Sequence, residues 1–410
     1  MSNDQNWQPP ADAQGPSHAA PFGSATDAPG TGPGAAGTVP QSAANPHQGW
    51  TPPPKPGLIP LRQLDLGAIL GASFRVLRRN PKPTYGAALL VYGVTVVATA
   101  VLVGLVTWAS LDRISTAARE DLDTITAGAL GAIILATVVP MILSVIGTAI
   151  LQGVLVVEVA RASLGEKLTL RQLLGLVKGR YWALIGWAFI LVGIGVVAMT
   201  VLILLVVALG FAIGGVAGAV LGTVIGIFGG LGLAALAVWL GTKVSLVPSV
   251  LVLERATLGL AVRRSWSLTN GYFWRTFGIQ LLVAVIIGLA LQFITTPLSL
   301  VAGISLALVN PNQADSGTAL TVGLILTIVS YLVTIAAGAL GAVVQSATPA
   351  ILYVDLRIRK EGLDLELIRF IEERQAGASD QPDPYRRHEE GSAVARSSLQ
   401  TPPGSDSPWA

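Results

Sequence analysis

The chain has 410 residues, of which 52% are hydrophobic and only 12% are charged, whereas an average soluble domain carries about 25% charged residues. Residues 84–353 hold 20 charges in 270 positions, so more than half of the charges lie in the shorter end segments. This distribution excludes one ordinary soluble enzyme and indicates a membrane-embedded core with polar tails.

The core contains neither cysteine nor histidine. The sequence has no cysteine at all, and its three histidines, His18, His47 and His388, lie in the polar end segments. Thiolate metal sites, cysteine nucleophiles and imidazole bases are therefore excluded from the core. We predict no catalytic, cofactor-binding or metal-ligating residues, because no recognisable motif combines a nucleophile, a base and an oxyanion donor.

Both end segments have the composition of disordered tails. Residues 1–57 are rich in Pro, Gly, Ala, Gln and Ser and contain no apolar run, so they cannot bury enough apolar surface to fold alone. Residues 376–410 are similar in composition. We therefore expect a membrane domain with its flanks at residues 58–375, and we expect protein partners to bind through the tails.

Six membrane spans are predicted from the apolar stretches, since a helix needs about 20 apolar residues to cross about 30 Å of hydrocarbon. Residues 181–253 contain a single charge, Lys243, and fit two long crossings or three short ones. All basic segments fall on one side, the cytosolic side, only if this stretch crosses twice. The predicted spans are about 85–109, 127–157, 182–210, 217–248, 277–300 and 319–352, with an external turn within 206–220 and both termini in the cytosol.

The spans are predicted to form three tandem helical hairpins, each preceded by a basic amphipathic interfacial helix, in an all-α integral membrane fold. The hairpin ends are similar, because an apolar run leads to an acidic residue at Glu158, Glu254 and Asp355 at nearly equal spacing. Three units in the same direction indicate an internal repeat. Many secondary transporters instead contain inverted repeats.

Six glycines recur every fourth residue around the third and fourth spans. This pattern is typical of a glycine zipper, in which the absence of side chains lets two helices approach closely. Close packing of these two helices or of two protomers is our main interpretation, and a pore or substrate groove is the alternative. The glycines are Gly210, Gly214, Gly218, Gly222, Gly226 and Gly230.

Four charged residues are candidates for a polar site. Glu158, Glu254 and Asp355 each have an arginine within three residues at the predicted cytosolic border. Because an isolated charge in hydrocarbon is costly, we interpret them as a structural latch between each hairpin end and the next amphipathic helix, with a proton or cation site as the alternative. Lys243 would lie near mid-depth in a straight helix, but we favour a bend at Pro248 that takes it to the interface.

Basic and aromatic residues flank the predicted interface. Arginines attract anionic phosphates and tryptophan rings prefer the headgroup zone, so these residues are candidate anchors or, alternatively, a lipid-headgroup pocket. Nucleic-acid binding is not expected, because the basic belt is short and tethered to the bilayer. The candidates are Arg78, Arg79, Arg263, Arg264, Trp266 and Trp274.

Three segments resemble the bacterial glycerophosphoryl diester phosphodiesterase membrane-domain family. They are Pro248–Glu254 (PSVLVLE), Ala261–Phe277 (AVRRSWSLTNGYFWRTF) and Tyr353–Asp364 (YVDLRIRKEGLD). The similarity extends over about residues 58–370 and implies an integral membrane protein of bacteria. Some relatives join this region to a phosphodiesterase barrel, whose catalytic His and carboxylate positions are not found here, so the resemblance transfers no catalytic residue.

The sequence therefore predicts a multi-pass protein of the bacterial plasma membrane. Its predicted role is that of a non-catalytic scaffold or accessory factor in envelope or lipid processes. The alternative is a transporter or lipid-translocating protein that uses the junction of the three hairpins, and a hydrolase is the third possibility. The expected partners are anionic headgroups on the cytosolic side, and no cofactor is expected. The sequence does not indicate whether the protein is a monomer or an oligomer.

Overall fold

A computed structural model of the chain describes residues 57–60, 62–116, 118, 121–309, 316–377 and 381–386. Nearly all of these residues are helical, and no β-strand occurs among them. Six of the helices are long and apolar enough to cross a membrane, which confirms the predicted all-α fold with six spans. Most of the two predicted tails lies outside the described residues.

The first hairpin follows a short amphipathic helix. Asp65 caps this helix by accepting a hydrogen bond from the amide of Ala68 at 2.6 Å. Ile69, Ala72 and Val76 recur at spacings of three and four residues and form its buried face. The elements are α1 (Leu66–Arg79), α2 (Pro81–Thr116) and α3 (Leu122–Ser163).

The second hairpin also follows a short capped helix. Thr169 and Gln172 form a capping box, in which the amide of Thr169 donates to Oε1 of Gln172 at 2.9 Å. The two long helices join at Gly214 and Gly215, whose φ angles of 68° and 56° are readily adopted only by glycine. This turn lies within the predicted window. The elements are α4 (Leu170–Val177), α5 (Tyr181–Ile213) and α6 (Gly215–Val244).

The fourth span ends in a broken helix. After Val244 come a short turn of helix, α7 (Val247–Ser249), and a π-helical turn, η1 (Val250–Glu254). Pro248 lacks the amide hydrogen that would bond the carbonyl of Val244, which removes one hydrogen bond of the α-helix at the point where it breaks. The predicted fourth span of about 217–248 lies within the apolar segment Gly215–Glu254, and the bend predicted at Pro248 is present as a helix break just before the proline.

The third hairpin is followed by one further helix. Gly271, with a φ angle of 83°, lies in the turn between the short helix and the fifth span, and Gly362, with a φ angle of 68°, separates the last two helices. The elements are α8 (Leu258–Thr269), α9 (Phe273–Val309), α10 (Ser316–Glu361) and α11 (Leu363–Gln375). Helices α3 and α10 extend well past the predicted spans, because hydropathy detects only the segment suited to hydrocarbon.

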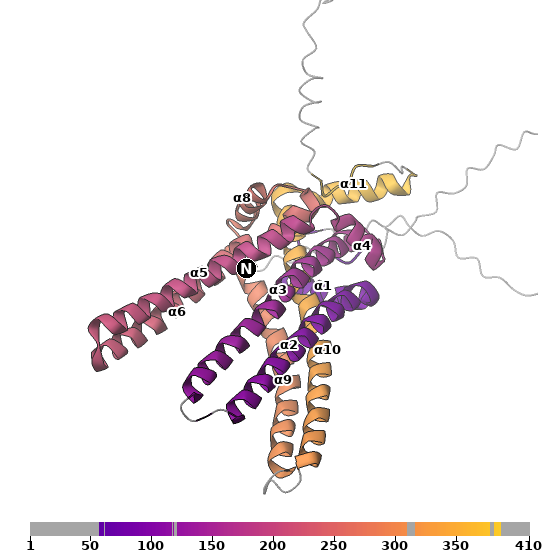
Figure 1. The fold of residues 1–410 in the computed structure, drawn as a ribbon. Helices are drawn as coiled ribbons and strands as arrows, with labels where there is room; N and C mark the ends of the chain where they lie inside the picture. Colours follow the sequence, from indigo (N-terminus) through magenta and orange to yellow (C-terminus); the bar gives the residue numbers. More distant parts are fainter. Residues whose placement is uncertain are drawn as a thin grey trace, which may run out of the picture. The chain divides into compact units, whose positions relative to one another are not determined.

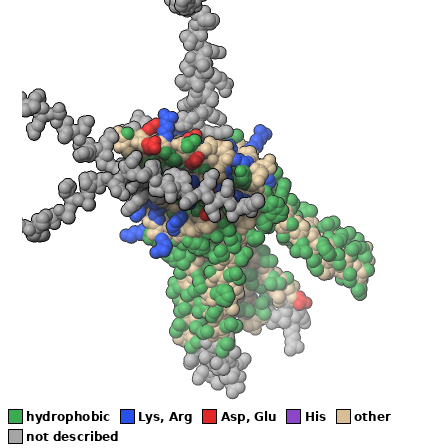
Figure 2. Space-filling view, turned by 180° about the vertical axis from the view of Figure 1, so that it is seen from behind, with side chains coloured by type: hydrophobic (Ala, Val, Ile, Leu, Met, Phe, Trp, Pro, Cys, Tyr) green, Lys and Arg blue, Asp and Glu red, His purple; other side chains and the backbone are tan. Residues whose placement is uncertain are grey.

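The short helices lie together at one end of the three hairpins (Figure 1). We call this region the base; it comprises α1, α4, α8, α11, η1, the last turns of α3 and α10, and residues 57–60, 62–65 and 381–386. Charged side chains gather at this end, whereas hydrophobic side chains cover the hairpins (Figure 2). The three tandem hairpins, each preceded by an amphipathic helix, are thus as predicted.

Glycines bring α5 and α6 together over part of the predicted zipper. A Cβ added to Gly218 would lie 2.7 Å from the carbonyl oxygen of Gly210 on α5. Gly214 forms the turn, and Gly230 has no neighbour within reach of a Cβ, whereas Gly229 faces α5. The two glycines between these positions, Gly222 and Gly226, face Val206. The glycine that faces α5 near this end of α6 is therefore Gly229 and not Gly230, so the four-residue spacing of the contact does not continue along α6.

Candidate functional site

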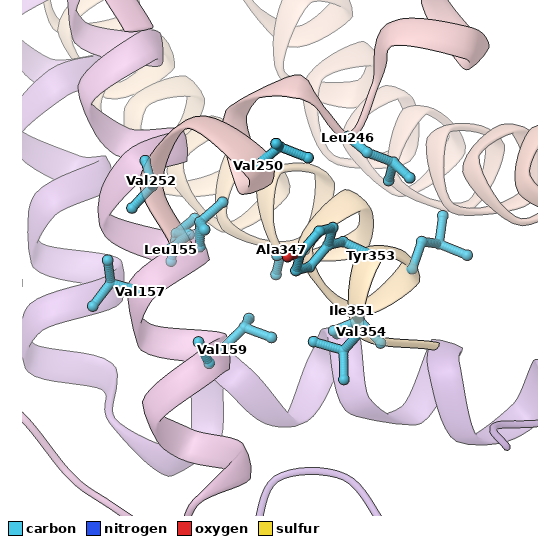
Figure 3. Close-up of a cluster of buried hydrophobic side chains, with 14 of the residues drawn as sticks. Leu155, Val157, Val159, Leu246, Val250, Val252, Ala347, Ile351, Tyr353 and Val354 are labelled. Carbon is cyan, nitrogen blue, oxygen red and sulfur yellow. The ribbon is translucent and has the colours of Figure 1, made fainter. Parts of the chain in front are cut away.

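Buried apolar residues from all three hairpins meet at the centre of the base. Leu155 on α3, Val250 on η1 and Ile351 on α10 are each 0% exposed, and their side chains lie in one cluster (Figure 3). Tyr353 fills the middle of this cluster and is fully buried. The three predicted acids follow directly after these apolar runs, so packing of the cluster brings the acids into the interior of the base.

Asp355 has the largest number of partners among the three acids. Its carboxylate accepts hydrogen bonds from the amide of Leu64 at 2.9 Å, from Arg275 at 3.2 Å and from Arg359 at 3.0 Å. Its side chain is completely buried. Because these donors lie before α1, on α9 and on α10, the carboxylate joins the first and third hairpins.

Glu254 connects the second hairpin to the third. Its Oε1 accepts a hydrogen bond from the Tyr353 hydroxyl at 2.7 Å and lies 3.3 Å from Nε of Arg264 on α8. Arg264 also pairs with Glu361, and Arg357 bonds both Glu361 and the Tyr353 hydroxyl. This network is a latch between a hairpin end and the next amphipathic helix.

Glu158 is less well satisfied than the other two acids. Its Oε1 accepts a hydrogen bond from Nδ2 of Asn80 at 3.2 Å, while its Oε2 is buried without a hydrogen-bond partner. Its sequence neighbour Arg161 instead bonds Asp383 at 2.5 Å. Likewise, no ion pair among the described residues joins Glu254 to Arg255 or Asp355 to Arg357. Glu254 and Asp355 are therefore paired with arginines other than those nearest in sequence, and Glu158 has no ion pair among the described residues.

One hydrogen bond is repeated at all three junctions between hairpins. In each case the acceptor is the carbonyl of the residue just before the N-cap of an amphipathic helix. The donor is a side chain near the start of the first long helix of a hairpin. The pairs are Asn80 to Leu168 at 2.8 Å, Arg180 to Ala256 at 3.2 Å and Arg275 to Leu64 at 2.6 Å. The last pair runs from the third hairpin back to the first, so the three junctions form a closed ring.

Residues 381–386 pack into the base, although they belong to the predicted C-terminal tail. Tyr385 is 1% exposed, its hydroxyl lies 2.5 Å from Oγ of Ser163, and its carbonyl accepts a bond from Arg357 at 3.2 Å. Burial raises the pKa of Tyr385 to about 12. The boundary predicted at residue 376 is corrected by this contact, because the packed region includes the buried residues Pro384 and Tyr385.

Lys243 lies beside α8 and not in the middle of a straight span. Its carbonyl accepts a hydrogen bond from Oγ of Ser265 at 2.7 Å, which also satisfies a carbonyl freed by the helix break. The side chain is only 7% exposed, and its ammonium lies 5.3 Å from the centre of the Trp266 ring and 5.8 Å from that of Phe273. The predicted bend therefore occurs, and the lysine packs against aromatic rings.

The predicted interfacial anchors divide into exposed and engaged residues. Arg78, Arg263 and Trp274 are exposed, and Trp274 is 77% exposed. Arg264 is instead occupied by Glu254 and Glu361, so it belongs to the polar network. Of the remaining candidates, Arg79 is partly exposed and Trp266 is exposed at 37%.

Besides a cavity of about 410 Å³ between α11 and residues 381–384, three cavities among the described residues lie away from Glu158, Glu254 and Asp355. One of about 490 Å³ lies between the far ends of α2 and α3, and one of about 270 Å³ lies between the apolar faces of α5 and α6. A third, of about 60 Å³, lies beside Tyr385. None of the three is lined by Glu158, Glu254, Asp355 or Lys243. Within the described ranges, no cluster of three or more His, Asp or Glu side chains has the arrangement of a metal site.

A scan against protein-family models, a search of curated proteins and a search of solved structures each found no match to this chain. The resemblance of residues 58–370 to the glycerophosphoryl diester phosphodiesterase membrane-domain family therefore rests on its sequence motifs alone. The six-span helical architecture and the contacts in the base are the observations from which a function can be argued.

Sequence reasoning missed two residues that organise the base. Asn80 binds both Glu158 and the carbonyl of Leu168, and Tyr385 is completely buried in a segment assigned to a tail. The Asn80-Pro81 step marks a helix boundary and is a usable signal for the first of these. For the second, the signal is Asp383-Pro384-Tyr385, an aromatic residue next to a turn-forming pair within polar sequence.

Proposed function

We propose that this chain is a multi-pass protein of the bacterial plasma membrane with its base and both tails on the cytosolic side. Arginine and lysine residues gather in the base, whereas the described far ends of the hairpins carry Arg113 with Asp112, Asp121 and Asp123. Cytosolic loops carry an excess of Lys and Arg, which supports this orientation. Labelling of single cysteines introduced at Arg263 and Asp123 tests it, because only the second should react with an impermeant reagent in intact cells.

Within that membrane, its role is that of a non-catalytic scaffold or accessory factor in envelope or lipid processes. The observation that carries this proposal is the closed base, in which apolar packing fills the junction of the hairpins and bonds between hairpins hold the acids. Such a junction provides a rigid cytosolic platform. The exposed amphipathic helices and the two tails are then the surfaces for lipids and partners.

The test is quantitative capture of partners from membranes by the full chain and by a chain lacking residues 1–56 and 387–410. A scaffold that acts through its tails should lose its stoichiometric partners on truncation, while its thermal unfolding in detergent stays unchanged. Restoration of a deletion phenotype by the truncated chain, at the same level as the full chain, would contradict the scaffold proposal. The truncation keeps the docked residues 381–386, so the full and truncated chains should fold equally and differ only in their tails.

Transport is the alternative function, and the buried ammonium of Lys243 is the observation that favours it. Ionisable residues within membrane-spanning segments often mark ion or substrate paths. The purified protein in liposomes should then move an ion or lipid faster than protein-free vesicles, and Lys243→Ala or Glu254→Gln should slow that movement. Movement equal to the protein-free rate removes this alternative and leaves the scaffold proposal in place.

Hydrolysis is the third possibility, and it follows only from the family resemblance. The base offers carboxylates that are engaged by arginines and hydroxyls, and none of them is positioned beside a histidine in the part of the chain that the structure describes. A phosphodiesterase of the usual kind needs a base or metal to activate its nucleophile. Release of glycerol 3-phosphate from a glycerophosphodiester by purified protein would overturn the non-catalytic proposal.

A further inference from the structure

Lys243 is a buried cation without a counter-charge. Its side chain is only 7% exposed, and no carboxylate among the described residues lies within 4.0 Å of its nitrogen. Its contacts are with the rings of Trp266 and Phe273. Contact with an aromatic face compensates only part of the loss of hydration, so the charge favours an added anion.

The neighbouring acids are already occupied. Glu254 is bound by Arg264 and by the hydroxyl of Tyr353, and Glu361 is bound by Arg264 and Arg357. These acids therefore cannot serve Lys243 as well. The junction of α6, α8 and α10 consequently carries positive charge in excess.

A second ammonium group lies next to the first one. Lys360 donates to the carbonyls of Ser267 and Asn270 at 2.6 and 2.7 Å, and its nitrogen lies 5.6 Å from the centre of the Tyr272 ring. No carboxylate among the described residues lies within the 4.0 Å of an ion pair, although the charge of Glu361 acts on this ammonium favourably and that of Lys243 unfavourably. Because Tyr272 precedes Phe273, the two lysines flank the same aromatic turn between α8 and α9.

The cation is unique to the second hairpin. Lys243 precedes Glu254 by 11 residues. The residues that precede Glu158 and Asp355 by the same distance are Gly147 and Val344. Moreover, α3 and α10 run through this position as continuous helices, whereas α6 ends one residue after Lys243. Broken helices and π-helical turns are frequent at functional sites. A shared structural role in three similar hairpins would not explain a feature that only one of them has.

We propose that the junction of α6, α8 and α10 binds a phosphate-bearing anion, either the phosphoryl group of a membrane lipid or free inorganic phosphate. Lys243 supplies the buried charge and Lys360 the exposed one, and each ammonium can form short charge-assisted bonds to a phosphoryl oxygen. Trp266, which is 37% exposed and packs edge-on against Trp239 at 5.4 Å, forms the wall of the site. Tryptophan at this position is typical of headgroup depth. The site does not depend on whether the protein is a scaffold or a transporter.

The experiment is a binding titration on the full-length protein in detergent, followed by native mass spectrometry. Phosphatidylglycerol is one probe and inorganic phosphate is the other. Lys243→Met keeps the length of the side chain and its contact with the rings but removes the charge, so phosphatidylglycerol should bind about tenfold more weakly. Lys243→Arg keeps the charge and should stay within about threefold of the unmodified protein.

Arg113→Gln is the control, because Arg113 is an exposed cation at the far end of α2, away from the base. It should change binding less than about twofold, since an exposed charge contributes little. An equal loss in Lys243→Met and Arg113→Gln, or no loss in Lys243→Met, overturns the proposal. If Lys243→Met does not fold, as judged by its thermal unfolding, Lys360→Gln takes its place with an expected loss of about threefold.

The two sources of phosphate are distinguished in the same titration. If millimolar inorganic phosphate binds to the lipid-free protein and this binding depends on Lys243, the physiological ligand is a free phosphate. If inorganic phosphate neither binds nor displaces phosphatidylglycerol, the ligand is a lipid headgroup. If neither probe binds, the proposed phosphate site is refuted. This result would not affect the scaffold proposal, which is tested separately by partner capture.

Discussion

Hairpins 1 and 3 hold each other, whereas the long arms of hairpin 2 pack mainly on themselves. Between hairpins 1 and 3, the Tyr85 hydroxyl donates to the carbonyl of Ala336 at 3.2 Å. A Cβ added to Gly338 would lie 2.7 Å from the ring of Tyr92. In hairpin 2, the equivalent close approach is internal, between Gly218 and Gly210.

This difference indicates that the protein uses glycine for two purposes. On α10, glycine lets a neighbouring hairpin approach, so it fixes the arrangement of two units. On α6, it lets the two arms of one hairpin approach, so it fixes only that hairpin. Hairpin 2 is therefore tied to the rest of the chain chiefly at its base, through Arg180 and the Glu254 network.

The largest effect should come from breaking the bond between hairpins 1 and 3. Asp355→Ala leaves Arg275, Arg359 and the amide of Leu64 without their shared acceptor, which should cost about 3–5 kcal/mol of unfolding free energy. The measurement is thermal unfolding of the detergent-solubilised protein. Asp123→Ala, an exposed acid at the far end, should change it by less than about 0.5 kcal/mol. Similar stability of the two variants would show that the bonds of Asp355 between hairpins 1 and 3 do not stabilise the fold.

Breaking the internal contact of hairpin 2 should have a smaller effect. Gly218→Ala places a Cβ against the backbone of Gly210, which cannot move aside as a flexible side chain can, and should cost about 1–3 kcal/mol. Gly230→Ala is the matched control on the same helix, because nothing lies within 4 Å of its added Cβ. It should be neutral or stabilise by up to about 1 kcal/mol. An equal effect of both substitutions would refute close packing of α5 and α6 at Gly218.

The docked segment 381–386 spans hairpins 1 and 3, and its release should have a milder effect. Tyr385→Phe removes the bond to Ser163 but keeps the buried ring, so docking should weaken by about 1 kcal/mol. The rate of tryptic cleavage after Arg386 reports this change. Ser163→Ala combined with Tyr385→Phe should add little to either single change, because both remove the same bond. Fully additive effects would show that the two hydroxyls act independently.

The smallest effect should be that of pH on the same segment. Burial raises the pKa of Tyr385 to about 12, above the value of about 10 for an unfolded tyrosine. The contribution of the neutral hydroxyl is therefore complete below about pH 10 and is lost as pH rises through about 12. Tryptic cleavage rates, corrected for the protease, should not reveal a loss of docking between pH 7 and 9. Release within that range would show that another group controls docking.

The six spans could be predicted from sequence because a long uncharged apolar stretch is rarely stable anywhere except in a membrane. The ends of the helices could not, since α3 and α10 continue into the base, where burial by other hairpins replaces burial in hydrocarbon. Ser163 and Glu361 are the last residues of helices that hydropathy ends much earlier. Pro248 allowed a helix break to be predicted from the sequence, but the residue at which the helix breaks depends on contacts with α8.

The acids could be recognised from the sequence as special positions, but their partners could not. Spacing along one chain favours neighbours such as Arg161, whereas this arginine binds Asp383 and Glu158 binds Asn80. Only contacts between distant segments decide such pairings, and a single sequence does not contain them. The same limit explains why the composition around Tyr385 predicts a tail.

The bond from Asp355 to the amide of Leu64 has a consequence for biosynthesis. Leu64 is translated before any of the three hairpins, yet its partners Asp355 and Arg275 are translated only with the last hairpin. Until then the carbonyl and amide of Leu64 lack their final partners, and the ring of junctions stays open. Completion of the base is therefore the final step of assembly, and a chain arrested before α10 retains an exposed polar edge that quality-control proteases can recognise.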